Sequence, residues 1–428
     1  MLTKIFFILI MYSERNNVYI KTLIKTNIRG GKIMVSLEML FDAQRVLREV
    51  ATVTPVIKAD KIAENIYLKS ENFQLTGSFK LRGAYYKIST LTPEEAAKGV
   101  IACSAGNHAQ GVALSATRKG IKSVICMPAG APISKVEATK GYGGEVVLVP
   151  GVYDDAAKKA EELMQEEGYT FVHPFNDEKV IAGQGTIGLE IIQQLPDVEA
   201  VYVPIGGGGL ISGVSYAIKA LKPDCKVIGV QALGAPSMYE SRKKGEVIEL
   251  EKVATIADGI AVKKPGDLTF EMCQKYVDEI VTVSEEEIAT AILTLMEKQK
   301  TVAEGAGATA LAAAMFDKAN LKGKKSVCIV SGGNIDVNTL SRVITQGLNK
   351  TGRIANIETK VVDKPGQLIS LLQLISHTGA NIISINHERE DLRSEVNSCV
   401  VTMVLETRNT EHVNQIKELL VSNGYEIL

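Results

Sequence analysis

AVYVPIGGGGL, residues 200–210, joins a run of apolar residues to four successive glycines. The apolar run is typical of a strand buried on both faces, and apolar residues at helical spacing continue from Leu210 to Leu221. Glycines at such a junction let several backbone N–H groups converge on one anion, and the positive end of the helix dipole adds to the attraction. The stretch therefore predicts a phosphate-binding turn. The alternative is a glycine-rich turn that binds nothing.

The surrounding residues indicate which class of phosphate-bearing ligand the turn could bind. Ile211 stands where the dinucleotide motif GxGxxG needs its third glycine, and the Gly-Lys-Ser/Thr of a nucleotide-binding P-loop is absent. The next apolar run ends at Gln231, where a dinucleotide fold prefers an acidic residue. A phosphate compound without a ribose therefore fits better than NAD or ATP.

On both sides of this stretch, short apolar runs alternate with helical patterns, which predicts a doubly wound α/β fold. The predicted strands are Ile66–Lys69, Val100–Cys103, Ser123–Met127, Glu145–Val149, Ala200–Ile205, Lys226–Gln231 and Ser326–Val330. The predicted helices are Leu37–Val50, Phe79–Thr90, Ala109–Lys119, Tyr153–Glu167, Gly185–Gln194, Leu210–Leu221 and Glu285–Lys298.

The pattern changes after a break at residues 347–352. The order becomes strand, helix, strand, strand, helix and a final short strand, which is typical of a ferredoxin-like unit. The predicted elements are strands Arg353–Val362, Ile382–Glu388 and Asn397–Leu405, and helices Gln367–Thr378 and Glu411–Ser422.

Three other segments carry residues that suit a binding site. Residues 104–108 (Ser104, Ala105, Gly106, Asn107 and His108) follow a predicted strand and suit a carboxylate, or form an ordinary capped helix start with His108 as a plain hydrogen-bonded histidine. Residues 331–334 (Ser-Gly-Gly-Asn) follow the last long strand and would otherwise be an ordinary loop. In residues 76–80 (Thr-Gly-Ser-Phe-Lys), residue type alone makes Lys80 a surface lysine. Ligands of open α/β sheets gather at the carboxyl ends of strands. Three of the four segments follow a predicted strand, and their convergence is stronger evidence for a site than any one of them.

Composition excludes several classes of protein. The net charge is −1, the basic residues are spread along the chain and Trp is absent, so a nucleic-acid polymer is not expected as a partner. The six cysteines form no CxxC and fit buried, reduced thiols of a cytoplasmic protein better than a zinc cluster or a disulfide framework. The apolar run Ile5–Met11 is too short to cross a membrane. We expect residues 1–33 to be a non-native or disordered extension, with Met34 as the native start, because Arg29-Gly30-Gly31 is what a translated ribosome-binding site would encode.

Together, the four segments resemble the fold-type II pyridoxal-phosphate enzymes, and among them the threonine/serine dehydratases, from about Leu37 to Ile344. The resemblance implies two open twisted α/β subdomains and pyridoxal 5'-phosphate as cofactor. It implies that Lys80 binds the cofactor as a Schiff base and serves as the catalytic base. The other implied contacts are Phe79 against the ring, Asn107 at the ring hydroxyl, Gly206, Gly207, Gly208, Gly209 and Leu210 around the phosphate, Ser331 at the pyridine nitrogen, and Ser104, Ala105, Gly106, Asn107 and His108 around the substrate carboxylate.

This family chemistry implies β-elimination from L-threonine to 2-oxobutanoate and ammonia, and also from L-serine to pyruvate. A neutral hydroxyl at Ser331 favours loss of the β-group over transamination, and Glu304 is a further candidate near the ring. Serine racemases of the family carry a second serine where this chain has Ala105, so we expect little racemisation. Gln231 and Ser237 replace the carboxylates of the racemases' divalent-metal site, so no metal is expected there.

The C-terminal unit resembles an ACT domain at residues 363–366 (Asp-Lys-Pro-Gly) and 378–382 (Thr-Gly-Ala-Asn-Ile). The resemblance implies an amino-acid or nucleotide effector bound where two copies pair, and hence a homo-oligomer, a dimer or a tetramer. Isoleucine inhibition would fit a biosynthetic enzyme and a nucleotide a catabolic one. The alternative is a structural dimerisation domain that binds no ligand.

The resulting domain prediction assigns 34–99 and 176–346 to a large cofactor-binding domain, 100–175 to a small substrate-binding subdomain and 353–428 to the ACT domain. Other functions stay open from the sequence. A β-replacement enzyme of the cysteine synthase or threonine synthase type shares the cofactor, as does serine racemase. A non-enzymatic amino-acid sensor would use the C-terminal unit alone.

Overall fold

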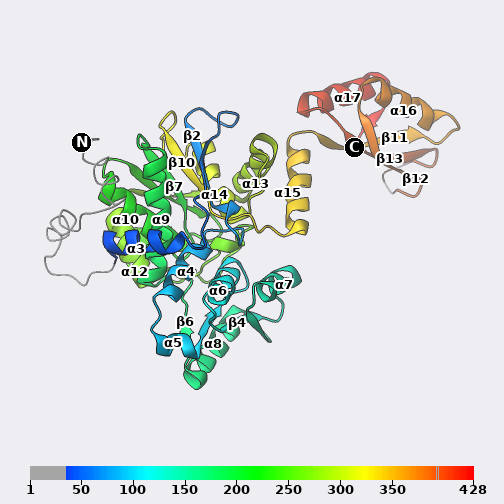
Figure 1. Cartoon of the computed structure of the whole chain (residues 1–428). Coiled ribbons are helices and arrows are strands. Elements are labelled where there is room, and N and C mark those ends of the chain that lie inside the picture. Colours follow the sequence, from blue (N-terminus) through cyan, green and yellow to red (C-terminus); the bar gives the residue numbers. More distant parts are fainter. Residues whose placement is uncertain (1–34, 392, 394) are drawn as a thin grey trace. The chain divides into compact units, whose positions relative to one another are not determined.

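A computed structural model describes residues 35–391, 393 and 395–428 (Figure 1). The predictions for residues 1–33 and for the start at Met34 lie outside these residues. The chain divides into two compact units between Ile335 and Asp336. Each unit has its own sheets and its own core, so each is described by itself.

The first unit is built on a six-stranded sheet with the strand order β1-β2-β10-β7-β8-β9. Its strands are parallel except β1, which pairs antiparallel with β2. The strands are β1 Val56–Lys58, β2 Ile66–Ser70, β7 Ala200–Pro204, β8 Lys226–Ala232, β9 Glu279–Val283 and β10 Ser326–Val330. Strands β7 and β10 are neighbours, so the glycine turn after β7 and Ser331 after β10 lie at the same edge of the sheet.

Helices cover both faces of this sheet, which lies between α9 and α10 on one side and α13 and α14 on the other (Figure 1). The fully buried strands β7 and β10 are consistent with this double cover. The helices around the sheet are α3 Leu37–Leu47, α4 Lys80–Ser89, α9 Glu178–Gln194, α10 Gly209–Leu221, α11 Ser237–Lys244, α12 Asp267–Tyr276, α13 Glu285–Thr294 and α14 Gly305–Met315, with 3-10 turns η2 Glu71–Phe73 and η3 Asp258–Ile260 and a π-helical turn η4 Leu295–Gln299.

A second, all-parallel sheet in the same unit has the order β5-β4-β3-β6. Its elements are β3 Val100–Cys103, β4 Ser123–Pro128, β5 Glu145–Val149 and β6 Thr170–Phe171, with helices α5 Pro93–Lys98, α6 Asn107–Arg118, α7 Ile133–Gly141 and α8 Tyr153–Glu167. Helix α6 starts directly beyond the carboxyl end of β3 and also packs against α4, which connects the two sheets of the unit.

The second unit is an antiparallel sheet with the order β12-β13-β11-β14, the order of a ferredoxin-like fold. Its elements are α15 Val337–Lys350, β11 Ile354–Val362, α16 Gln367–His377, β12 Asn381–Glu388, β13 Ser398–Glu406, α17 Thr410–Ser422 and β14 Glu426–Ile427. Its core contains residues of β11, β13, α16 and α17 and none from the first unit. The predicted fold class, two α/β sheets and a ferredoxin-like unit, is confirmed.

Two further sequence predictions concern the state of the cysteines and the absence of a membrane-spanning segment. All six cysteines are buried and free. Across the described residues, no helix is both long enough and apolar enough to span a bilayer.

Candidate active site

Lys80 is the first residue of α4, and its amine lies inside the first unit. Lys80 Nζ donates a hydrogen bond to the Pro174 carbonyl oxygen at 2.8 Å. Burial lowers the pKa of the amine to about 8, and the carboxyl of Glu304 opposes that shift. The ring of Phe79, the preceding residue, has its centroid 5.4 Å from Nζ. The amine is therefore held ready to lose a proton close to neutral pH.

The same segment that holds this amine also packs against the glycine turn. Phe175, which follows Pro174, lies so close to Gly207 that a Cβ there would overlap its ring. A Cβ on Gly209 would lie 2.8 Å from Phe175 Cα. Gly208 has φ +98°, a conformation that favours glycine, and it precedes α10. The dipeptide Pro174-Phe175 thus contacts both Lys80 and the predicted phosphate turn.

The end of β10 approaches Lys80 from another direction. The Phe79 N–H donates to the Ser331 carbonyl oxygen at 3.1 Å, and Ser78 forms a β-bridge with Gly332. Ser331 is only 2% exposed. The structure therefore brings Lys80, the glycine turn and Ser331 together, although they are separated by more than a hundred residues along the chain.

Asn107 and Glu304 form a hydrogen-bonded pair beside this group. Asn107 Nδ2 donates to Glu304 Oε1 at 2.7 Å, and Asn107 Oδ1 accepts from Asn334 Nδ2 at 2.7 Å. Burial raises the pKa of the Glu304 carboxyl to about 7, with Asp258 adding to the rise and Asn107 and Lys80 opposing it. A Cβ on Gly332 would overlap Glu304 Oε1 and lie 3.2 Å from Asn107 Nδ2. These polar groups therefore lie against the turn that follows β10.

The loop at residues 104–106 leaves open space at its tip. Ser104 Oγ accepts a hydrogen bond from the Gly106 N–H at 3.2 Å, and a Cβ on Gly106 would meet no atom within 4 Å. Helix α6 starts at the next residue, Asn107, so its first backbone N–H groups have no partner within the helix. An open loop at a helix N-terminus suits a carboxylate.

The side chain of His108 points into the protein interior and forms a structural hydrogen bond. His108 is 3% exposed, and its Nε2 donates to the Val172 carbonyl oxygen at 2.8 Å. Burial and the nearby Lys80 lower the pKa of the imidazole to about 3. The ring is therefore neutral at physiological pH, and the backbone of His108 lies in the first turn of α6, next to the open loop.

Several residues of this region carried no recognisable signal in the sequence. His173 Nδ1 accepts from the N–H groups of Phe175 and Asn176, at 3.2 Å and 2.8 Å, and so fixes the dipeptide that contacts Lys80 and the glycines. Arg82 of α4 is fully buried between the carboxylates of Glu71 and Glu190. No local pattern reveals such contacts, because the partners are distant in the sequence.

The geometry suits a compound that carries an aldehyde and a phosphate. An amine whose pKa is lowered to about 8 is partly neutral near neutral pH and can react with an aldehyde, and four glycines at a helix N-terminus can surround a phosphate. Ser78 Oγ is buried and, within the described part of the chain, has no hydrogen-bond partner, so a polar group is still expected beside Lys80.

The chain belongs to the family of pyridoxal-phosphate dependent enzymes, whose sequence profile matches residues 47–332. It is 52% identical over 398 residues to an L-threonine ammonia-lyase of Thermotoga maritima, a match that covers 92% of this chain and 99% of that protein. It is 49% identical over 287 residues to a catabolic L-threonine dehydratase of Escherichia coli, covering 67% of this chain and 87% of the relative.

Two solved structures are similar to the chain over about the same region. The processed form of threonine deaminase isoform 2 from Solanum lycopersicum is 40% identical, with a TM-score of 0.69, and the match covers 74% of this chain and 96% of that one. Maize serine racemase is 35% identical, with a TM-score of 0.70, and the match covers 74% and 98%. The cofactor predicted from the sequence is thus the cofactor of the family.

Proposed function

We propose that the chain is a pyridoxal-phosphate-dependent ammonia-lyase that converts L-threonine to 2-oxobutanoate and ammonia, and L-serine to pyruvate. The observation that carries the proposal is the meeting of the buried Lys80 amine, the glycine turn and Ser331 in one place. The L-threonine ammonia-lyases among the relatives, at 52% and 46% identity, support the substrate class.

We assign the residues of the site as follows. Lys80 links to the cofactor, Phe79 packs beside the ring, Gly206–Leu210 surround the phosphate, and Ser331 and Asn107 bind the ring nitrogen and ring hydroxyl. Residues 104–108 receive the substrate carboxylate. When bound, pyridoxal phosphate supplies an electron sink for a carbanion at the substrate Cα.

The protein's own contribution to the chemistry is positioning and proton transfer. A lysine amine with a pKa of about 8 is partly neutral near neutral pH, which suits a general base for the Cα proton. The Ser331 hydroxyl is neutral, so it does not hold a proton on a pyridine nitrogen as a carboxylate would. That difference favours expulsion of the β-hydroxyl over transamination.

The test is a spectrum of the purified protein followed by addition of L-threonine without any thiol. We expect an absorbance band of a lysine-bound cofactor and rapid release of 2-oxobutanoate, both lost in Lys80→Ala. Turnover that needs an added thiol would instead identify a β-replacement enzyme, and a colourless protein that cannot be reconstituted would overturn the proposal.

Serine racemase is the second candidate, because maize serine racemase is among the similar structures. Ala105 argues against it, since an alanine offers no hydroxyl to act as acid and base on the opposite face of Cα. We expect pyruvate from L-serine with little D-serine. D-serine appearing at a rate close to that of pyruvate would favour the racemase.

For the C-terminal unit we propose an ACT domain that senses an amino acid or a nucleotide. Its ferredoxin-like strand order supports this, and β12 is an edge strand with Ile383 and Ile385 exposed, as expected where two copies pair. We therefore propose a cytoplasmic homo-oligomer, a dimer or a tetramer. We also propose the domain ranges predicted from the sequence, 34–99 with 176–346, 100–175 and 353–428, although residues 336–346 lie in the second compact unit of the structure.

The regulatory role is tested by assays with isoleucine, valine and AMP, on the full chain and on a chain ending near Asn349. We expect one effector to change the kinetics of the full chain only. If the shortened chain and the full chain respond alike, or neither responds, the unit has a structural role. Analytical ultracentrifugation gives the number of copies.

A further inference from the structure

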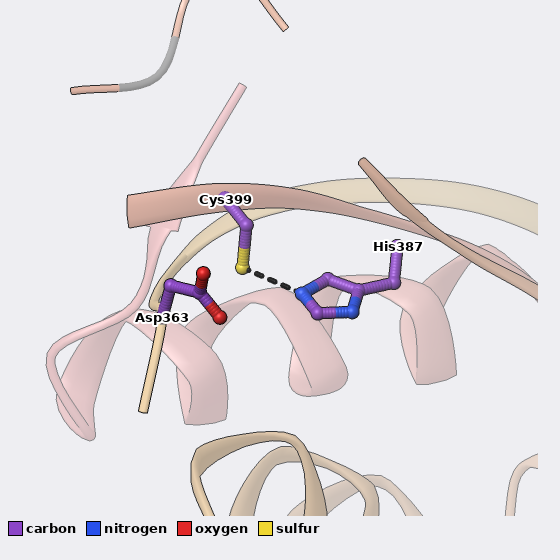
Figure 2. A group of neighbouring side chains, drawn as sticks. All are labelled: Asp363, His387 and Cys399. Carbon is purple, nitrogen blue, oxygen red and sulfur yellow. Dashed lines mark hydrogen bonds between the residues drawn. The ribbon is translucent and has the colours of Figure 1, made fainter. Parts of the chain in front are cut away.

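Three different metal-ligating side chains meet in the second unit, away from the candidate active site. Asp363 follows β11, His387 lies near the end of β12, and Cys399 is the second residue of β13. One ligand atom from each lies within 4.8 Å of the others. Figure 2 shows the imidazole and the carboxylate on either side of the sulfur.

The strand register explains why these residues meet. Strands β12, β13 and β11 are neighbours, with His387 opposite Val401 and Cys399 opposite Val361. Because side chains alternate across a sheet, Cys399 and Val401 share a face, and His387 reaches Cys399 along the diagonal. The sheet itself therefore holds two of the ligands, and the chain leaving β11 supplies the third.

The three ligand atoms, all within 4.8 Å of one another, would form a metal shell after shifts of about 1 Å or less. His387 Nε2 lies 2.9 Å from Cys399 Sγ. In a tetrahedral zinc site with bonds of about 2.0–2.3 Å, neighbouring ligand atoms lie about 3.3–3.8 Å apart. The nitrogen and the sulfur would separate by less than about 1 Å to admit an ion between them. His387 and Asp363 are exposed, which leaves a route for the ion and a position for a water ligand.

From this geometry we propose that Asp363, His387 and Cys399 bind a divalent zinc ion, with a fourth position open to water or another donor. One sulfur, one imidazole nitrogen and one carboxylate oxygen form a donor set that zinc accepts, whereas calcium and magnesium prefer oxygen alone. The sequence predicted no metal, both because Gln231 and Ser237 replace the carboxylates of a metal site in the first unit and because the spacing of the six cysteines fits no zinc cluster. The proposal departs from that prediction, since its site uses a single cysteine and takes its other two ligands from distant positions in the chain. The proposal is independent of the lyase activity.

Arg389 is the natural competitor of the ion. Its Nε lies 2.9 Å from Asp363 Oδ2, and its second guanidinium nitrogen donates to Oδ1 at 3.2 Å. Both partners are on the surface, where an ion pair contributes little stability, so a divalent ion can displace the guanidinium. Replacing Arg389 is therefore expected to raise the zinc affinity, whereas replacing any of the three ligands is expected to lower it.

The test uses the full chain, freed of metal with a chelator and then equilibrated with zinc alone. Equilibrium dialysis is expected to give one zinc per chain, and X-ray absorption to give one sulfur at about 2.3 Å with nitrogen and oxygen at about 2.0–2.2 Å. Cys399→Ser, His387→Asn and Asp363→Asn should each weaken binding at least tenfold. Arg389→Gln should strengthen it severalfold, and His377→Asn, an exposed histidine of the same unit, should leave it unchanged.

Two outcomes would overturn the proposal. One is a zinc shell without sulfur, and the other is zinc affinity that is the same in His387→Asn as in His377→Asn. Cys399 is buried, so Cys399→Ser is read only if its circular dichroism matches that of the unchanged chain. The variants at the exposed residues His387 and Asp363 keep the test decisive if Cys399→Ser does not fold.

Discussion

At the scale of single residues, Gly207 is the position where one added methyl group should matter most for the cofactor. A Cβ there would overlap the Phe175 ring, and overpacking in a rigid site costs about 1–3 kcal/mol. We expect Gly207→Ala to weaken pyridoxal-phosphate binding by roughly 5–150-fold, as that energy range implies.

The matched control is Gly130→Ala, because a Cβ at Gly130 would meet no atom within 4 Å. Cofactor affinity is measured by equilibrium dialysis of both variants. Equal affinities in the two variants would show that the glycine turn does not shape the phosphate site.

Glu304 gives a pH-dependent prediction. Its folded-state pKa is raised to about 7 from an ordinary 4.5, so the folded protein favours the neutral carboxyl. The associated stability is fully present below about pH 4.5 and is lost as the pH rises through about 7. Glu304→Gln stays neutral, so we expect it to be more stable than the unchanged cofactor-free chain at about pH 8, by up to about 3 kcal/mol, and equally stable near pH 4.5.

Urea denaturation of both cofactor-free chains at the two pH values measures this difference. A stability difference between the two proteins that does not change with pH would contradict the raised pKa.

At the scale of elements, the packing of α9 against α10 depends on glycines in the helices. A Cβ on Gly213 of α10 would overlap the Ile181 carbonyl oxygen of α9. We expect Gly213→Ala to lower the free energy of unfolding by about 1–3 kcal/mol or more, since two backbones cannot move apart without opening the core. Gly141→Ala at the end of α7 meets no neighbour and should be neutral or slightly stabilising.

Thermal unfolding of the two glycine variants compares them directly. If Gly213→Ala melts no earlier than Gly141→Ala, the close approach of the two helices is not rigid.

Elements with a strong periodic signal were predicted closely from the sequence. Strands β3, β5 and β10 and helix α8 match their predicted ranges, and the glycine turn begins α10 as expected. Helix α9 was predicted only from Gly185, but it begins at Glu178, because glycines that weaken helix propensity serve here for close packing. Helix α14 was missed, since its alanine-rich sequence is apolar all round and has no amphipathic pattern.

The candidate site was only partly accessible to sequence reasoning. Strand ends could be placed at a sheet edge by a general rule, which located Ser331 and the glycine turn. The hydrogen bond between Asn107 and Glu304 and the contact of Pro174 with Lys80 join residues far apart in the chain. Such pairings depend on how the two sheets of the unit pack, which no local pattern encodes.

At the scale of the whole molecule, the second unit has a separate core built from its own strands and helices. We therefore expect residues 336–428, produced alone, to fold cooperatively, with the helix and strand content of a ferredoxin-like unit. Circular dichroism and a single cooperative urea transition would check this. A spectrum typical of a disordered chain would mean that the unit needs the rest of the protein.

Lys69 and Lys80 differ in how easily their amines can be released from their partners. Lys69 Nζ is held by the Glu190 carboxylate at 2.5 Å, so moving it would strand an uncompensated negative charge in the interior, at a cost of about 3–5 kcal/mol. Lys80 donates to a peptide carbonyl, which carries no formal charge, so breaking that hydrogen bond costs about 1.5–3 kcal/mol, the range for hydrogen bonds of a charged group. In the proposed role Lys80 changes partners in every catalytic cycle, and it is the lysine with the weaker interaction, whereas Lys69 is bound by an opposite charge.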